Sequence, residues 1–378
     1  MPSSFGSALR VTIFGQSHSP AIGCVIEGLP SGHYIDLEAL AQHMKHRSPG
    51  QARWSTPRKE ADAVSILSGL NQSGTTSGAP LALVIQNTNT RPGDYEELKR
   101  VPRPGHADWT AQQKWHGAQD VSGGGHFSGR LTAPLCAAGG IAMQLLSERG
   151  ICIAAHLSEC AGVTDEAFLA RGSIADTEAL AAQMHSLKDG RSFPVLSELA
   201  AEEMQIQIER ARKSCDSVGG IVECVATGLP SGIGSPMFDG IESTLARIVF
   251  GIPAVKGLEF GAGFSAARMR GSEHNDPYVI VDGKIYPAKN DAGGNLGGIT
   301  SGAPLLWRMA VKPTSSIAQE QHSVDLIRNE ETVLRIRGRH DPCIAPRAVP
   351  VAESACALAI LDSWLAWPPC GADDEHCL

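Results

Sequence analysis

The 378-residue sequence contains few aromatic residues and more acidic than basic side chains. Aromatic residues make up 5% of the chain, and 32 lysines and arginines face 40 aspartates and glutamates, which gives a formal net charge of −8. Proteins that bind nucleic acid need basic side chains along the phosphates and often aromatic rings on which the bases stack. The composition therefore disfavours nucleic acid as a partner.

Several short signatures are also absent. The ten cysteines form no C-x-x-C pair and the histidines form no H-x-x-x-H pair, so we predict no metal site. The sequence lacks the G-x-x-x-x-G-K-[ST] loop of nucleotide hydrolases and the G-x-S-x-G turn of serine hydrolases. No apolar run approaches the roughly 20 residues that cross a bilayer, and the first residues do not resemble a secretory signal. We expect a cytoplasmic protein with no membrane partner.

Basic side chains are nevertheless concentrated in two segments. Residues 45–59 contain five lysines and arginines and no acid, and residues 335–347 contain four arginines and a single acid, Asp341. Solvated helix faces would explain such runs. However, guanidinium groups also bind carboxylates and phosphates through paired hydrogen bonds. In an acidic protein, these local clusters favour a small polyanion as the ligand.

Two segments occur twice, in the same order. "IGCVIEGLPSG" (22–32) is similar to "GIVECVATGLPSG" (220–232), and "TTSGAPLALVI" (75–85) is similar to "ITSGAPLLWRM" (299–309). Each pattern predicts a strand beside a turn that contains proline and glycine. Unless common turns match by chance, the chain consists of two similar halves, about 1–200 and 201–350, within one domain that spans residues 1–366. Residues 367–378 are expected to form a flexible tail.

The periodicity of apolar residues also predicts helices. Apolar spacings of three and four residues, together with capping residues such as Asp36, place them at 37–47, 131–148, 177–187, 197–213, 238–250 and 351–366. Strand and helix patterns follow one another without a regular βαβ spacing. We therefore predict an α+β fold rather than a doubly wound parallel sheet.

Three further segments contain side chains suited to anion binding or proton transfer. In "GGGHFSGR" (123–130), glycines before a predicted helix would let backbone N–H groups approach an anion. His18 and His106 lie in turn-rich segments where a histidine can transfer protons, although a surface or capping role fits either one alone. The segment "KPTSS" (312–316) offers the lysine and hydroxyls of a phosphate cradle.

Taken together and in order, seven segments resemble the motifs of the chorismate synthases. They are "RVTIFGQSHSPAIGCVIEGLPSG", "HRSPGQARWSTPRKEADAVSILSG", "RPGHADWTAQQKW", "GGGHFSGRLTA", "NDAGGNLGGITSGAP", "VKPTSSI" and "GRHDPCIAPRAVPVAE". They run from residue 10 to residue 353, so the resemblance covers nearly the whole chain.

The resemblance implies a β-α-β sandwich, in which helices are layered between sheets, and a homotetramer. It also implies a lyase of the shikimate pathway that converts 5-enolpyruvylshikimate 3-phosphate into chorismate and phosphate by 1,4-elimination, with reduced FMN as cofactor. NADPH is a candidate reductant for that flavin. The alternative is a catalytically inactive regulatory subunit that binds flavin or a phosphorylated metabolite.

The resemblance also assigns roles to residues. His18 would protonate the leaving phosphate, His106 would help to protonate the reduced flavin, and Asp341 would relay the proton lost from the substrate. Five arginines match positions that bind the substrate or NADP(H), namely Arg47, Arg53, Arg103, Arg130 and Arg339. The FMN contacts would come from His126, Phe127, Ser128, Pro253, Ala254, Gly297, Lys312, Pro313, Thr314, Ser315, Ser316 and Arg339.

The sequence departs from the common motifs of the family at some of these positions. It has His126 and Phe127 in the glycine loop and Pro253 where asparagine is usual, while Ser128 and Arg130 are retained. We interpret the departures as a variation within a subgroup of the family. The departures affect the contacts with the flavin that the resemblance implies for residues 126, 127 and 253.

Overall fold

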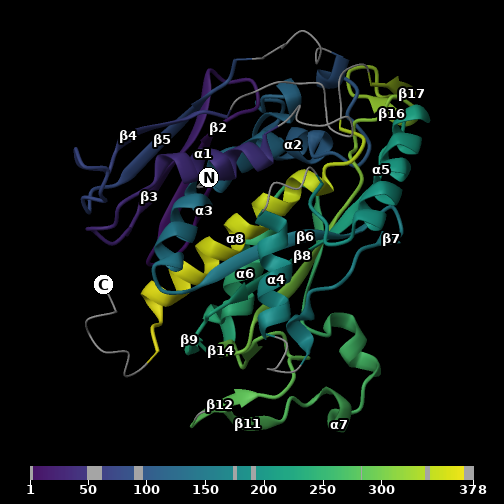
Figure 1. Cartoon of the computed structure of the whole chain (residues 1–378). Coiled ribbons are helices and arrows are strands. Elements are labelled where there is room, and N and C mark those ends of the chain that lie inside the picture. Colours follow the sequence, from purple (N-terminus) through teal and green to yellow (C-terminus); the bar gives the residue numbers. More distant parts are fainter. Residues whose placement is uncertain are drawn as a thin grey trace.

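Two five-stranded antiparallel sheets dominate the structure, a computed structural model that describes residues 3–48, 62–88, 97–172, 177–188, 193–281, 283–336 and 341–369 (Figure 1). The first sheet contains, in spatial order, β1 (Ser4–Phe5), β2 (Arg10–Gly15), β3 (Ala21–Glu27), β5 (Leu81–Gln86) and β4 (Val64–Ser68). The second contains β10 (Val255–Phe260), β15 (Leu305–Val311), β8 (Gly220–Thr227), β6 (Cys152–Cys160) and β7 (Val163–Thr164).

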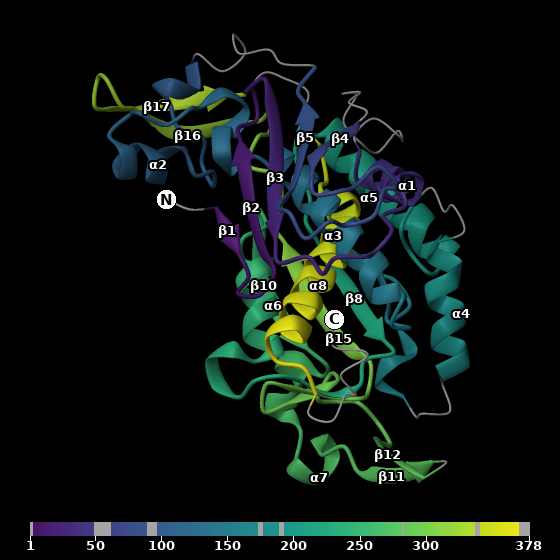
Figure 2. The same ribbon diagram turned by 90° about the vertical axis from the view of Figure 1, so that its left-hand side faces the viewer.

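Helices fill the space between the two sheets. α3 (Thr132–Ser147) packs on β3 and β5 of the first sheet, and α8 (Ala345–Ala366) packs on β6 and β8 of the second. α3 and α8 also pack on each other, and α1 (Leu37–Arg47) and α6 (Ile241–Val249) lie beside them, as Figures 1 and 2 show. One cluster of buried apolar side chains includes residues of both sheets and all four helices. The predicted α+β class and the sandwich of sheets around helices are confirmed.

The repeated segments form equivalent strand pairs. In the first sheet β3 pairs with β5 and Cys24 lies opposite Leu83, and in the second β8 pairs with β15 and Cys224 lies opposite Trp307. Cys24 and Cys224 are 200 residues apart, and Leu83 and Trp307 are 224 residues apart, which are the offsets of the two sequence matches. The two strand pairs therefore have the same register. The strand order is also equivalent, since β2, β3, β5 and β4 correspond to β6, β8, β15 and β10. This equivalence supports the duplication inferred from the sequence.

The turns of the two halves are held in the same way. The Thr76 hydroxyl donates to the carbonyl of Pro30 at 2.7 Å, and the Thr300 hydroxyl donates to the carbonyl of Pro230 at 2.7 Å. The second sheet also takes a strand from before residue 200. β6 begins at Cys152 and pairs with β8 of this sheet. In the sequence, α4 (Thr177–Lys188) and α5 (Glu198–Lys213) lie between β6 and β8, so the division predicted near residue 200 falls within this helical insertion.

The predicted helices agree with the observed ones at most ends. α8 is the main difference, since it begins at Ala345 instead of residue 351. Pro346 lies in its first turn, where a missing N–H costs nothing, and Pro350 lies further in. α2 (Asp108–Trp115) was not predicted, because only Asp108 and Ala111 of this short helix are buried. Residues 370–378 of the predicted tail lie outside the described residues.

The helix α8 is long and consists mostly of apolar residues. It is the one helix of the described segments that is long and apolar enough to cross a membrane, yet most of it is buried inside the protein. It is fully covered by α3, α6 and the second sheet along most of its length. Its apolar character is thus explained by its place in the core.

The remaining elements extend the sandwich at its two ends. At one end, β16 (Glu320–Asp325) and β17 (Glu330–Arg335) form a hairpin near α2 (Figure 2). At the other end lie β9 (Ser231–Gly234), β13 (Asn295–Leu296) and β14 (Ile299–Ser301), with the hairpin of β11 (Tyr278–Val281) and β12 (Lys284–Pro287) and α7 (Gly271–His274) beyond them. Single 3-10 turns occur at Glu97–Lys99, Ser122–Phe127, Gly129–Leu131, Leu169–Arg171, Met237–Asp239 and Gly263–Arg268.

A buried charge cluster joins β6 to β8 and to the segment before α5. The His156 ring lies 2.8 Å from Asp165 through Nδ1 and 3.1 Å from Glu223 through Nε2. The backbone N–H groups of Leu196 and Ser197 also donate to Asp165. Burial alone would lower the pKa of His156, but hydrogen bonds to the two carboxylates raise it above its ordinary value. The imidazolium thus balances two buried acids.

Replacing His156 by glutamine should destabilise the protein by about 3 kcal/mol or more at pH 6, because two buried carboxylates lose their cation. The contribution of His156 is complete below its ordinary pKa of 6.5 and is lost as the pH rises through the raised pKa of the folded state. Urea unfolding between pH 5 and 9 should therefore show the difference between wild type and variant shrinking with pH. The exposed His322→Gln variant is the control, and a difference independent of pH would contradict the assignment.

Candidate active site

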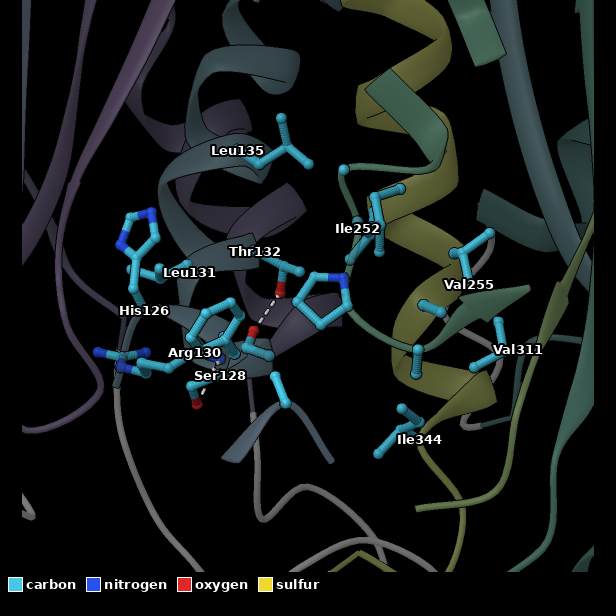
Figure 3. A pocket seen from close by; sticks show the side chains of 18 of the residues that line it. His126, Ser128, Arg130, Leu131, Thr132, Leu135, Ile252, Val255, Val311 and Ile344 are labelled. Carbon is cyan, nitrogen blue, oxygen red and sulfur yellow. Dashed lines mark hydrogen bonds between the residues drawn. The ribbon is translucent and has the colours of Figure 1, made fainter. Parts of the chain in front are cut away.

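A cavity of about 1030 Å³ lies where the first turns of α3 and α8 meet the last residues of α1 and α6. Figure 3 shows Leu135 of α3 on one side and Ile252, Val255 and Ile344 on the other. The N-termini of α3 and α8 and the C-termini of α1 and α6 thus all lie at the cavity, so the opposite partial charges of these helix ends offset one another.

The structure brings most of the predicted site residues together at this cavity. They come from segments that are far apart in the sequence, mostly from loops and turns that precede or follow helices and strands. The lining includes Arg47, Arg103, His106, His126, Phe127, Ser128, Arg130, Pro253, Ala254, Lys312, Pro313, Thr314, Ser315, Ser316 and Asp341. Arg53 and Arg339 lie outside the described residues.

The glycine loop separates the two predicted catalytic histidines. Gly123 and Gly124 have positive φ angles of 62° and 90°, which residues with a Cβ atom rarely adopt. A Cβ atom on Gly123 would lie 2.4 Å from the His18 ring, and one on Gly124 would lie 3.1 Å from Nε2 of His106. The absence of side chains here lets both rings contact the loop. His18 itself lies behind Gly123, which lines the cavity.

Gly297 is the described site residue that the structure places elsewhere. It lies in the exposed turn between β13 and β14 with a φ of 63°, and it does not line the cavity. The strands β13 and β14 pair with β9 rather than with either large sheet. Because of this pairing, the turn lies away from the N-termini of α3 and α8 of its own chain.

His106 is held by an aspartate that the sequence reasoning missed. Nδ1 of His106 lies 2.6 Å from Asp108, and Arg103 donates to both oxygens of the same carboxylate, at 2.7 and 2.8 Å. Burial alone would raise the pKa of Asp108, but the hydrogen bonds from Arg103 and His106 hold it well below its usual range. The ionised carboxylate places the ring proton on Nδ1 and directs Nε2 towards Gly124. The spacing of two residues between His106 and Asp108 is the sequence feature that could have indicated this pair.

Arg47 and Arg130 share a second missed aspartate. Nη1 of each arginine donates to Asp62, one to each carboxylate oxygen, and the Ser48 hydroxyl donates to the same group at 3.1 Å. The Asp62 side chain is completely buried. Burial would raise the pKa of Asp62, but the charges of Arg47 and Arg130 lower it, so the carboxyl group stays ionised. Asp62 lies within the quoted segment "HRSPGQARWSTPRKEADAVSILSG", but the resemblance assigned no role to it.

Asp341 lies at the cavity wall and forms an ion pair. Nη1 of Arg347 donates to Asp341 at 2.7 Å, while Nε of the same arginine donates to the carbonyl of Arg47 at 3.1 Å. Arg347 therefore connects the first turn of α8 with the end of α1. It belongs to the second arginine cluster of the sequence, but it was not predicted to be a site residue.

The KPTSS segment is connected to the loop that carries His106. Lys312 donates to the Ser315 hydroxyl at 2.9 Å and to the carbonyl of Gly105, and Ser315 donates to the same carbonyl at 2.8 Å. Burial, and then the charge of Lys256, lower the pKa of Lys312. The buried Thr314 hydroxyl has no hydrogen-bond partner among the described residues, although it lines the cavity.

The lining of the cavity is strongly cationic. Among the described residues, seven arginine and lysine side chains contribute to it, against one carboxylate, that of Asp341. The cations are Arg47, Arg103, Arg130, Arg247, Lys256, Lys312 and Arg347. Because the whole chain has a net charge of −8, this concentration is local and points to a ligand with several negative charges.

The two variant residues of the glycine loop have structural contacts of their own. Nε2 of His126 lies 2.6 Å from the Ser3 hydroxyl and Nδ1 lies 3.2 Å from the carbonyl of Gly15. The ring of Phe127 packs against Trp115 of α2, with 5.8 Å between the ring centroids. Both side chains therefore connect the loop to neighbouring elements while also lining the cavity.

Comparison with known proteins agrees with these observations. The family model "Chorismate synthase" matches residues 9–365. Chorismate synthase from Lancefieldella parvula is 48% identical over 371 residues, which cover 97% of each chain. Chorismate synthase from Korarchaeum cryptofilum is 46% identical over 366 residues, which cover 95% of this chain and 96% of the relative. A crystal structure of chorismate synthase superposes with a TM-score of 0.74 at 25% identity, covering 96% of this chain and 93% of that one. The chain belongs to the chorismate synthase family.

Proposed function

We propose that the chain is an active chorismate synthase, which removes phosphate and a proton from 5-enolpyruvylshikimate 3-phosphate to give chorismate. The observation that carries this proposal is the cavity with seven cationic side chains and one carboxylate in an acidic protein. The substrate has two carboxylates and one phosphate, so its charge complements this lining. Guanidinium groups bind each of these anions through paired hydrogen bonds.

The two histidines are assigned to separate proton transfers, and the leaving phosphate is assigned to His18 alone. His18 contacts Gly123 at the cavity wall, and we assign it as proton donor to the leaving phosphate. His106 receives a fixed orientation from Asp108, so its Nε2 can hold and release a proton at the opposite face of the loop. Asp341 is assigned to the proton lost from the ring, because it is the one carboxylate of the described lining.

Reduced FMN fits the wall formed by the KPTSS segment. The unpartnered Thr314 hydroxyl, together with Lys312 and the Ser315 and Ser316 hydroxyls, would hold a phosphate group there. When bound, reduced flavin supplies electron density to the substrate ring as the bond to phosphate breaks. The apolar side chains of Ile252 and Val255 would exclude water from the same region. NADPH is proposed as the reductant of the flavin.

Assembly as a homotetramer is part of the proposal and is supported by exposed apolar side chains. Met237 and Phe238 are 75% and 83% exposed, and Leu296 is 49% exposed. The turns that carry them are adjacent, since a Cβ atom on Gly240 would lie 2.7 Å from the Cα atom of Gly298. An exposed apolar patch of this kind favours contact with another copy.

The cytoplasm is the proposed location, and neither membrane nor nucleic acid is a proposed partner. The burial of α8 and the net charge support this. A catalytically inactive role is disfavoured, because His106 and Asp341 line the cavity and His18 contacts Gly123, which also lines it.

The first test is an anaerobic assay of the purified protein with chemically reduced FMN and 5-enolpyruvylshikimate 3-phosphate. We expect phosphate release and the absorbance of chorismate to rise in equal amounts. Binding of both ligands without product would favour an inactive binding protein instead. Repeating the assay in air with NADPH and oxidised FMN tests whether the protein reduces its own flavin.

The Asp341→Asn variant should slow turnover at least about tenfold, or about 1.4 kcal/mol in the barrier, because an amide cannot accept the proton. It can still accept a hydrogen bond from Arg347, so the affinities for FMN and substrate should stay within about threefold of wild type. Single-turnover kinetics measures the rate. Asp325→Asn, which changes a buried aspartate that pairs with Arg100 instead, is the control. An unchanged rate would remove Asp341 from the chemistry.

Arg47→Ala and Arg130→Ala should each weaken substrate binding at least about tenfold, because a bound anion would lose a charged hydrogen-bond donor. Calorimetry with substrate measures the effect. Arg212→Ala removes an exposed arginine of α5 and should leave the affinity unchanged. Wild-type affinity in both cavity variants would refute the assigned anion site.

A further inference from the structure

We propose that Asp62 is a positioning residue for substrate binding, which acts by holding Arg47 and Arg130 in a common orientation at the cavity wall. For the identity of the substrate, this inference rests on the proposed function. Asp62 does not itself line the cavity, whereas both arginines do. Its effect on the ligand must therefore pass through their guanidinium groups.

The two arginines reach Asp62 from different parts of the fold. Arg47 is the last residue of α1, and Arg130 lies in the turn Gly129–Leu131 before α3. Their exposed fractions are 3% and 8%, so both charges are nearly removed from water. Two adjacent buried cations repel each other strongly unless an anion lies between them. The Asp62 carboxylate occupies that place and accepts from one arginine on each oxygen.

The hydrogen bonds of the two arginines follow one pattern. In each, Nη1 donates to Asp62 and Nε donates to a neutral oxygen. That oxygen is the Thr132 hydroxyl, at 3.1 Å, for Arg47. It is the side-chain amide oxygen of Asn87, at 3.0 Å, for Arg130. Hydrogen bonds from two different nitrogens fix the plane of a guanidinium group. Because a guanidinium binds an oxyanion best when it is already oriented, this arrangement reduces the entropy lost on binding.

The backbone at Asp62 supports a dedicated role. Its φ is 48°, in the left-handed region that residues other than glycine seldom adopt. A glycine would adopt this conformation without cost but would supply no carboxylate. Ser48, directly after α1, adds a hydroxyl donor to the same oxygen that binds Arg47. The carboxylate is thus held by three side chains.

The charge balance of the cluster also suits an anionic ligand. Two arginines and one aspartate leave one net positive charge, so Asp62 keeps the arginines stable without cancelling their attraction for an anion. The cation pair by itself would be costly in the empty site. A buried carboxylate also orients Arg103, but there a single arginine pairs with Asp108.

The test is substrate binding by Asp62→Asn, measured by calorimetry with the full chain. The amide keeps the shape but cannot bind both arginines as a charged bridge, so we expect the substrate Kd to rise at least tenfold, while the Kd for FMN changes less than threefold. In the double variant, the fold-increase in substrate Kd should be smaller than the product of the increases in Asp62→Asn and Arg47→Ala. The reason is that Asp62 acts through Arg47. Multiplicative effects, or a substrate Kd within twofold of wild type, would overturn the inference.

A matched control separates positioning from general loss of stability. Asp362 is also buried, but it accepts from the backbone N–H groups of Ser7, Ala8 and Leu9 at the far end of α8. Asp362→Asn should lower the melting temperature without changing the substrate Kd. If Asp62→Asn does not fold, Ser48→Ala replaces it, with an expected two- to fivefold loss of affinity. An unchanged affinity in Ser48→Ala would then count against the inference.

A second ligand keeps this test independent of the proposed function. Inorganic phosphate, titrated into the same variants, needs the arginines but no chorismate chemistry. Weaker phosphate binding in Asp62→Asn, with no binding of 5-enolpyruvylshikimate 3-phosphate by the wild type, would support the positioning role and reject the proposed substrate. Equal phosphate affinity in wild type and variant would reject the positioning role.

Discussion

Close packing of α3 on α8 determines where everything else in the molecule lies. A Cβ atom on Gly139 would lie 2.2 Å from the Cβ atom of Ser354, so the two helix backbones approach as near as they can. A Cβ atom on the adjacent Gly140 would lie 2.8 Å from the end of the Leu40 side chain of α1. Glycine inside a helix costs about 1 kcal/mol relative to alanine, and the contact between the helices must offset this. The contact fixes the distance between the sheets and brings the first turns of α3 and α8 to the same cavity.

That geometry creates an electrostatic problem, which buried carboxylates resolve. The ends of α1 and α6 bring Arg47 and Arg247 to a cavity that other arginines also line, so positive charge accumulates there. Asp62, Asp108 and Asp341 each pair with at least one of the arginines at its wall. Charges so arranged stay oriented in the absence of ligand. The anion that enters then completes a set of hydrogen bonds instead of having to assemble them.

Much of the fold could be predicted because its signals are local. The strand pairs of both halves were visible as repeats, and α1 was predicted at 37–47 because its capping residue and apolar spacing are regular. The start of α8 was missed because Pro346 and Pro350 resemble a turn, whereas tertiary packing makes them helical. In the site, the resemblance identified the residues that line the cavity. It assigned no role to Asp62, whose arginine partners lie 15 and 68 residues away in the sequence. It also assigned none to Asp108, although Arg103 and His106 are close to it in the sequence.

The glycine loop explains why variation at His126 and Phe127 is compatible with the proposed activity. What the loop must provide is close backbone approach, since Gly123 and Gly124 contact the rings of His18 and His106 and no side chain would fit there. The two variant residues instead connect the loop to its surroundings, His126 to Ser3 and Gly15, and Phe127 to Trp115. Such connections can be made by other pairs of side chains when their partners change as well. Substitution is therefore constrained most strongly at the glycines, and less at the residues that follow them.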